Sequence, residues 1–312
     1  MKNESSLSSM RCTLHVTLLA FVYALLLVTV WFPDTNPDWK TLAARFVLAG
    51  TAYAGVVWSV NRFVRRETSR LFLYTVTVLA LNGFLFGAVG PLQHIFIPTW
   101  MDTTVLAWEF AVMGTDVCLW MNQFVNPWLT EWMMFAYVIY VPLLLIVALI
   151  CLKSAGPRAA TDYLLNLSLG NMVCFTGFIL FPVAGPMVHY PEQFTAPLNG
   201  WFFTWCGEWM RSNAHYPGGC LPSPHCAAST VMLVMVYRYR RGLFFALLPI
   251  VLTIYVSTVY GRYHYASDSV AGIAAAVIVL KLSPLVVRGV EYLARRTKHI
   301  VPSAPIPESV TE

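Results

Sequence analysis

The chain has 312 residues, of which 58% are hydrophobic and only 11% are charged. Ordinary soluble domains carry about 25% charged residues, so this composition excludes a soluble globular protein and indicates a membrane protein. The formal net charge of +5 comes without a basic stripe along the chain. Such a stripe is typical of nucleic-acid binding, so we expect no nucleic-acid partner.

Apolar runs of the length that spans a bilayer recur along the chain. They predict an all-α fold, a polytopic membrane helix bundle with about eight transmembrane helices. The first run could instead be a signal peptide, since Lys2 and Arg11 precede it. It continues into Trp31 and Phe32 without a small-residue cleavage pattern, however, so we expect it to be retained. The predicted spans cover residues 14–32, 41–60, 71–90, 130–152, 163–181, 225–240, 243–260 and 269–287.

The basic residues predict the orientation of these spans. With the N-terminus inside, the cytoplasmic segments hold most of the 20 Lys and Arg residues, as the positive-inside rule requires. Those that fall on the other side are Lys40, Arg45, Arg211 and Arg262. Both termini are then cytoplasmic, and residues 288–312 form a basic tail that we expect to be disordered from residue 301.

The segment 91–128, between the third and fourth spans, contains no Lys or Arg. Asp102, Glu109 and Asp116 recur in it every seven residues, among several tryptophans. This pattern is typical of an amphipathic helix that lies in the headgroup layer. We expect the three acids to form its wetted face; a metal or polyol site is the alternative.

Two of the seven cysteines, Cys206 and Cys220, share one predicted outer loop. An oxidising compartment could join them, but spacing alone does not establish a disulfide. No Cys-x-x-Cys pair occurs, and nothing else in the sequence favours a metal site or a cofactor.

A first candidate site lies at Ser223, Pro224 and His225. Serine is a good helix cap and proline favours the first helical position, so a helix should begin here. The N–H groups of its first turn can bind phosphate, with His225 close by. The alternative is that these residues only begin a transmembrane helix.

A second candidate site ends the seventh span, where the chain reads Ser257-Thr-Val-Tyr-Gly-Arg-Tyr-His-Tyr-Ala-Ser-Asp268. A helix would place His264 and Asp268 on one face, since they are four residues apart. The carboxylate would then orient the imidazole and prepare its other nitrogen for attack or proton transfer. Arg262 is a candidate cation for an anionic substrate. The alternative for His264 and Asp268 is a solvated pair on the protein surface.

These two motifs together resemble the type-2 phosphatidic acid phosphatase superfamily. The first is similar to its P-S-G-H motif, and the second to S-R-x-x-x-x-x-H-x-x-x-D. The resemblance implies a six-helix phosphatase-type core over residues 71–287, preceded by two additional transmembrane helices in residues 1–70.

The chain departs from that pattern at three places. Thr258 replaces the arginine of the S-R pair, Pro224 replaces the glycine, and no K-x-x-x-x-x-x-R-P motif precedes the outer loop. Instead, Phe181-Pro-Val-Ala-Gly-Pro-Met187 ends the fifth span. This pattern looks more like the branch that contains inositol phosphorylceramide synthase and its bacterial relatives, which transfer phosphoryl-bearing head groups between lipids.

The resemblance implies a metal-independent lipid phosphate phosphatase or phosphotransferase. His264, oriented by Asp268, would form a phosphohistidine, and His225 would act as the acid and base. Ser223, Arg262 and Arg211 would bind the phosphate. The partners would be a lipid phosphate and a water or alcohol acceptor, on the outer face of the membrane.

Two alternatives stay open from the sequence. An inositol-type head-group transferase would use the same catalytic residues as a hydrolase. A transporter or scaffold would instead retain the fold without catalysis, and should show polar residues deep in several spans. Only isolated ones occur, namely Asn82, Asn166, Ser168 and Asn171.

Overall fold

The computed structural model of the protein describes residues 2–214 and 216–300. These residues form helices and connecting loops, and no β-strand occurs among them. The long helices are α1 (Lys2–Trp31), α2 (Trp39–Phe63), α3 (Glu67–Val89), α6 (Pro127–Leu180), α9 (Pro224–Tyr239), α10 (Arg241–Tyr260) and α11 (Ala266–Ile300). The short ones are α4 (Asp102–Met113), α5 (Val117–Asn122), α7 (Pro186–His189) and α8 (Phe202–Ala214), with 3-10 turns at Pro33–Thr35, Gly90–Leu92 and Pro191–Gln193.

The predicted all-α membrane bundle is confirmed, but its helices divide differently from the predicted spans. Six helices of the described chain are long and apolar enough to cross a membrane. Two predicted spans are the two arms of α6, a helix of 54 residues that departs from helical geometry at Ala155 and Gly156. The predicted span 225–240 is α9, which has only 16 residues. At 1.5 Å per residue it is about 24 Å long, shorter than a bilayer core of roughly 30 Å.

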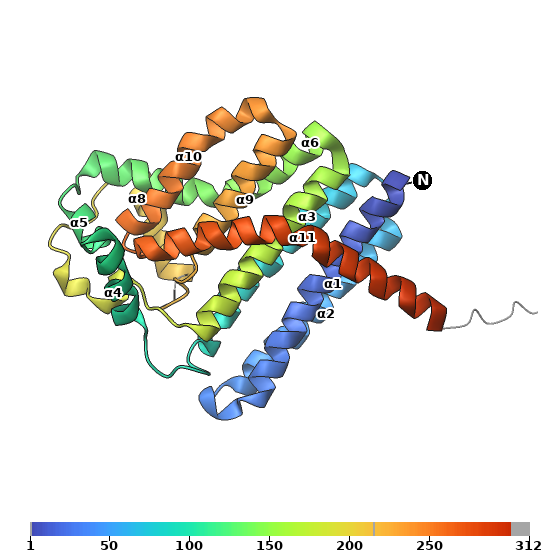
Figure 1. Cartoon of the computed structure of the whole chain (residues 1–312), viewed down its shortest axis with the longest axis horizontal. Coiled ribbons are helices and arrows are strands. Elements are labelled where there is room, and N and C mark those ends of the chain that lie inside the picture. Colours follow the sequence, from blue (N-terminus) through green and yellow to red (C-terminus); the bar gives the residue numbers. More distant parts are fainter. Residues whose placement is uncertain (1, 215, 301–312) are drawn as a thin grey trace, which may run out of the picture.

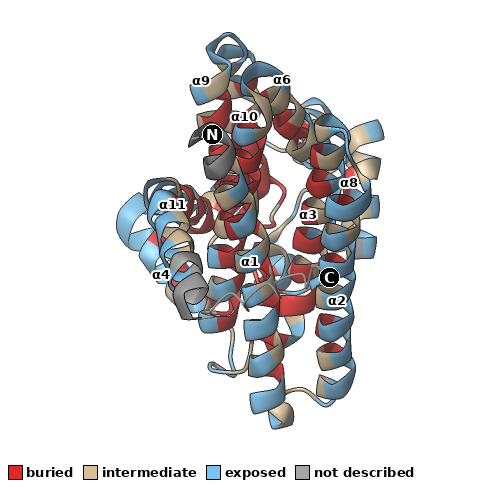
Figure 2. Ribbon diagram, turned by 90° about the vertical axis from the view of Figure 1, so that its right-hand side faces the viewer, coloured by how far each residue is buried: buried red, intermediate tan, exposed pale blue. Residues whose placement is uncertain are grey.

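Helix α9 is the centre of the bundle. It packs against α6, α10 and α11, and most of its side chains are buried. Small residues on α9, including Ala227, Ala228 and Ser229, let the neighbouring helices approach closely. On α11, a Cβ at Gly272 would collide with the carbonyl oxygen of Ser223, so only glycine permits this crossing. Figure 2 shows buried residues concentrated along the faces where the helices meet.

The short helices gather at one end of the molecule, on the left in Figure 1. The ends of several long helices lie beside them. Gln93, just beyond α3, donates to the Pro217 carbonyl at 3.1 Å and accepts from the Gly219 N–H at 2.8 Å. A Cβ at Gly177, near the end of α6, would collide with Pro222. The ends of α3 and α6 are therefore held beside the start of α9.

The segment 91–128 is not one amphipathic helix, so that prediction is wrong. It contains α4 and α5, which are separated at Gly114, a glycine with φ of 72°. The prediction that the three acids form a wetted face is also wrong, because Asp102, Glu109 and Asp116 are 0%, 1% and 5% exposed. Burying carboxylates is costly unless donors surround them, and here the donors come from loops that are distant in sequence.

Candidate active site

The region around His264 is a turn followed by a helix start. Helix α10 ends at Tyr260, and Arg262 has φ of 67°, which reverses the chain. The N–H groups of Tyr263 and His264 both donate to the Thr258 carbonyl at 3.1 Å. Helix α11 begins only at Ala266, so His264 and Asp268 do not share a helix face. The predicted helical stacking is wrong, although the fold still brings the two side chains together.

The imidazole of His264 has three polar neighbours. Its Nδ1 lies 3.0 Å from the Cys220 carbonyl oxygen and 3.5 Å from Asp268 Oδ2, while its Nε2 lies 3.3 Å from Ser223 Oγ. A carbonyl oxygen can only accept, so the proton of the neutral ring belongs on Nδ1 and Nε2 keeps its lone pair. The Cys220 carbonyl therefore shares the orienting role that the sequence alone assigns to Asp268.

Burial controls the charge of His264, which is 3% exposed. Desolvation lowers the pKa of His264 to about 4, although the hydrogen bond to the Cys220 carbonyl opposes the shift. The ring is therefore neutral at physiological pH. A neutral imidazole with a free lone pair on Nε2 is the form that can act as a nucleophile.

Asp268 belongs to the first turn of α11 and ties two segments together. Its Oδ2 accepts from the Tyr265 N–H at 2.9 Å, and its carbonyl accepts from the Ser223 N–H at 3.0 Å. The start of α11 is thereby fastened to the start of α9. Without this tie, His264 and Ser223 would have no fixed separation.

The predicted helix start at Pro224 is confirmed. Ser223 is the N-cap of α9, and its Oγ accepts from the Cys226 N–H at 3.4 Å. His225 lies in the first turn, with its ring stacked on Tyr137 at a centroid distance of 4.9 Å. The rings of His225 and His264 are 5.8 Å apart. The two histidine motifs, 39 residues apart in the chain, therefore meet at one place.

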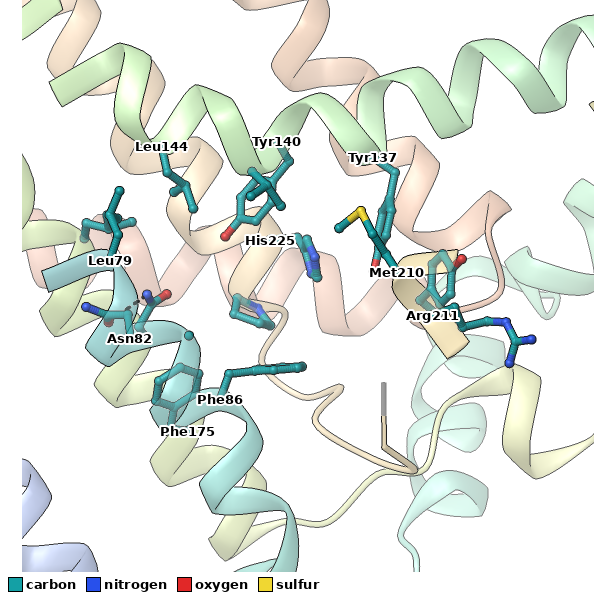
Figure 3. A pocket seen from close by; sticks show the side chains of 16 residues that line it. Leu79, Asn82, Phe86, Tyr137, Tyr140, Leu144, Phe175, Met210, Arg211 and His225 are labelled. Carbon is teal, nitrogen blue, oxygen red and sulfur yellow. Dashed lines mark hydrogen bonds between the residues drawn. The ribbon is translucent and has the colours of Figure 1, made fainter. Parts of the chain in front are cut away.

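His225 also lines a cavity of about 340 Å³ between α3, both arms of α6, α8 and α9. Most of its lining is apolar, including Phe86, Tyr140 and Phe175 (Figure 3). Arg211 is the cationic residue among those that line it. The cavity thus runs from His225 into the apolar interior of the bundle.

The two arginines proposed from the sequence lie in different surroundings. Arg262 stacks on Phe194, with its guanidinium carbon 4.3 Å from the ring centroid, and donates to Asn122 Oδ1 at 3.0 Å and to the Ala196 carbonyl. These contacts occupy its guanidinium away from the cavity. Arg211 forms an ion pair with Glu208 on α8, and the hydrogen bond to Glu208 raises the pKa of Arg211.

Three buried acids, two in α4 and one at the start of α5, contact the segments that form the site. The sequence analysis did not predict these contacts. Asp102 accepts from the N–H groups of Ala184 and Gly185 at 2.8 and 2.9 Å, and from the Tyr265 hydroxyl at 2.9 Å. Glu109 accepts from the N–H groups of Ala266 and Ser267 at 3.0 and 3.4 Å.

Asp116 completes the group. It caps α5 and accepts from the Tyr190 hydroxyl at 2.7 Å. In the sequence, the seven-residue spacing is the feature that could have identified the three acids as a group with a common role. Their position in a segment without Lys or Arg indicates that backbone N–H groups must supply the donors.

The thiol of Cys220 is buried next to the site. Both Cys206 and Cys220 are free, so the pairing that the sequence left open is not formed here. Candidate metal ligand atoms of Cys220, His264 and Asp268 lie within 4.8 Å of one another. Each already has a backbone partner: Cys220 Sγ donates to the Tyr263 carbonyl at 3.3 Å, and the other two have the contacts given above. Asp268 Oδ1, in contrast, is buried and has no hydrogen-bond partner among the described residues.

Comparison with known proteins agrees with the geometry. A family model described as the PAP2 superfamily matches residues 103–282, which is more than half of the chain and includes both histidine motifs and most of α4. No match was found among curated proteins or among solved structures. The matched region begins one residue after Asp102 and ends within α11, so it contains the described site residues except Asp102. The chain belongs to the PAP2 superfamily.

Proposed function

We propose that the protein is an integral membrane enzyme that removes or transfers the phosphoryl group of a lipid phosphate through a phosphohistidine. Members of its superfamily are generally phosphatases, which supports a phosphatase-type activity. The observation that carries the proposal is the histidine pair. The ring centroids of His225, in the first turn of α9, and His264, in the turn before α11, lie 5.8 Å apart. His225 lines an apolar cavity, and His264 is neutral with Nε2 unprotonated.

The first step forms a bond between His264 Nε2 and phosphorus and breaks the bond between phosphorus and the lipid oxygen. His225, in its protonated form, gives its proton to the leaving oxygen. In the second step a water molecule attacks phosphorus, the N–P bond breaks, and His225 takes the proton of that water. Asp268 Oδ2 lies 3.5 Å from His264 Nδ1 and stabilises the positive charge that develops on the ring.

The phosphate oxygens need donors at the start of α9. The hydroxyl of Ser223 lies 3.3 Å from His264 Nε2, where the phosphoryl group would be transferred. Arg211 is the cationic residue among those that line the cavity, so we assign the contact with the phosphate to Arg211 in preference to Arg262. Preorganised donors of this kind stabilise the charge of the transition state without moving during the reaction.

Transfer to an alcohol is the second candidate reaction. It uses the same two histidines and replaces water by a hydroxyl group, such as that of an inositol-type acceptor. The absence of the K-x-x-x-x-x-x-R-P motif and the presence of Phe181 to Met187 favour this candidate. A non-catalytic transporter is less well supported, because Asn82, Ser168 and Asn171 form one hydrogen-bonded cluster and are not spread through several spans.

We assign α4 a positioning role. Glu109 holds the N–H groups of Ala266 and Ser267, the two residues between Tyr265 and Asp268. Asp102 holds the Tyr265 hydroxyl. Together they determine where α11 begins, and therefore where His264 and Asp268 lie relative to Ser223.

The two histidines should respond differently to substitution. His264→Ala is expected to abolish the phosphoenzyme, because it removes the nitrogen that would attack phosphorus. His225→Ala should slow intermediate formation mainly with alkoxide leaving groups and be partly rescued by a leaving group that needs no proton. Rapid-quench measurement with labelled phosphatidic acid and an aryl phosphate checks both. Equal losses with every leaving group would remove the acid role from His225.

The two arginines can be separated by their effects on turnover. Arg211→Ala should lower kcat/KM about a thousandfold or more, the order expected for loss of an arginine that stabilises a transferring phosphoryl group. Arg262→Ala should cost less, because its guanidinium is engaged by Asn122, Ala196 and Phe194. Glu208→Gln is the control, since it removes only the partner of Arg211. A larger loss of kcat/KM in Arg262→Ala than in Arg211→Ala would show that Arg262, and not Arg211, contacts the phosphate.

Glu109→Gln tests the positioning role. Hydrogen bonds to a charged group contribute about 1.5–3 kcal/mol, so kcat should fall roughly tenfold to a hundredfold while KM changes little. The matched control is Asp162→Asn, an acid that accepts from Arg238 and Tyr239 instead of from groups at the site. If Glu109→Gln lowers Tm but leaves kcat per folded molecule unchanged, the role of Glu109 is structural only.

We also propose that the site faces away from the cytoplasm, from the distribution of Lys and Arg. Asn199 is exposed in the loop before α8, and Ser69 is exposed at the start of α3. In a Cys206→Ser background, Asn199→Cys should react with an impermeant maleimide in intact cells, whereas Ser69→Cys should react only after lysis. The reverse pattern would invert the topology.

A further inference from the structure

The cavity beside His225 extends well below the catalytic end of the bundle. Asn82 and Asn171 line it, seven residues before the end of α3 and nine before the end of α6. At 1.5 Å per residue these positions are about 10 and 14 Å below those helix ends. His225, in contrast, lies in the first turn of α9, beside the same ends. The cavity therefore runs from the histidine toward the middle of the bilayer.

The asparagines form a hydrogen-bonded cluster in this otherwise apolar lining. Asn171 Nδ2 donates to Asn82 Oδ1 at 3.0 Å, and Asn82 Nδ2 donates to Ser168 Oγ at 3.2 Å. Asn171 is only 8% exposed, yet its Oδ1 has no hydrogen-bond partner among the described residues. A buried polar atom without a partner costs free energy. Since Asn171 lines the cavity, a ligand there could supply the missing partner.

Figure 3 shows the order of these groups along the cavity. Asn82 lies near Leu79 and Phe175 on one side, His225 is in the middle, and Arg211 is on the opposite side. Aromatic and aliphatic side chains fill the interval, and they favour hydrocarbon. A ligand with an anionic head at Arg211 and His225 would thus direct an apolar chain toward the amide cluster.

We propose that this cavity holds one hydrocarbon chain of the substrate and that the Asn82–Asn171 cluster binds a hydroxyl group carried within that chain. A hydroxyl both donates and accepts, so it satisfies Asn171 whichever way the amide is turned. The inference rests on the proposed function in taking the occupant of the cavity to be the lipid phosphate. It adds a second recognition point, roughly 10 Å from the reacting phosphorus along the helix axes.

The test compares two lipid phosphates of equal chain length, 3-hydroxystearoyl and stearoyl phosphatidic acid; the hydroxyl of the first lies roughly 10 Å from phosphorus, which is the depth of the amide cluster. The full chain in detergent should favour the hydroxylated lipid in kcat/KM by roughly threefold to tenfold, the worth of one hydrogen bond within a membrane protein. Asn171→Leu should abolish this ratio. Asn166→Leu is the matched control: it lies on the same arm of α6, bonds Asp162 and does not line the cavity. A ratio that is unchanged in Asn171→Leu overturns the proposal and leaves the amides as contacts between helices.

Binding separates failure of the pocket from failure of the proposed function. Displacement of a fluorescent stearoyl lipid from the His264→Ala variant measures the same preference without turnover. If the wild-type protein turns over neither lipid but binds the hydroxylated one more tightly, the proposed function fails and the chain pocket stands. Equal displacement by the two lipids overturns the pocket.

A second variant keeps both amides and blocks the cavity. Gly83 lines it, and a Cβ there would meet no atom within 4 Å, so a larger side chain has room to enter. Gly83→Leu should weaken binding of the stearoyl lipid severalfold and spare a hexanoyl one. Gly87→Leu, on the same helix and outside the lining, should change neither. Unchanged binding of the stearoyl lipid in Gly83→Leu overturns the proposal.

Discussion

The junction between α9 and α11 is the contact on which the site depends. The Ser223 N–H donates to the Asp268 carbonyl, and Gly272 lets α11 approach that same serine without a collision. One hydrogen bond and one missing Cβ thus determine the separation of the two histidine motifs. His225 lies in the first turn of α9 and His264 two residues before α11, so a shift of either helix start would change the distance between the two rings. Proteins that need two reactive groups from different helices gain from such a short connection between helix starts.

The three buried acids extend this junction outward. Their carboxylates accept hydrogen bonds from residues 184, 185, 266 and 267 and from two tyrosine hydroxyls. In the low dielectric of a protein interior, hydrogen bonds to charged acceptors are strong. The loops around the site are therefore held by electrostatic contacts to the two short helices α4 and α5 and not only by apolar packing. This suits a site at the membrane edge, where exposed loops would otherwise be free to move.

The parts that the sequence predicted correctly depend on local chemistry. Ser223 and Pro224 start a helix because capping and a fixed φ act within one turn. The helical bundle follows from the apolar runs alone. The prediction that His264 and Asp268 share a helix face was wrong because Arg262 takes a positive φ. An arginine in the sequence gives no indication of that conformation.

Other features required the tertiary structure. The donors to Asp102 lie more than 80 residues away, at Ala184 and Gly185, so no local pattern could show that the acid is buried. The bend that separates the two arms of α6 lies at Ala155 and Gly156, where the backbone leaves helical geometry. Arg262 looked like the obvious cation because it is two residues from His264, yet its side chain bonds to Asn122, 140 residues earlier.

The short length of α9 has a consequence for how a lipid reaches the histidines. Its 16 residues end at Tyr239, followed by Arg240 and Arg241, and such basic residues anchor a helix end at the headgroups. With that end anchored, the helix start falls about 6 Å short of the opposite hydrocarbon boundary. Because α9 is enclosed by α6, α10 and α11, this shortfall is met inside the protein and not by the lipid. Under the proposed function, the phosphate head group of a lipid would have to descend below its usual level to meet His225, and would lose part of its hydration before the reaction begins.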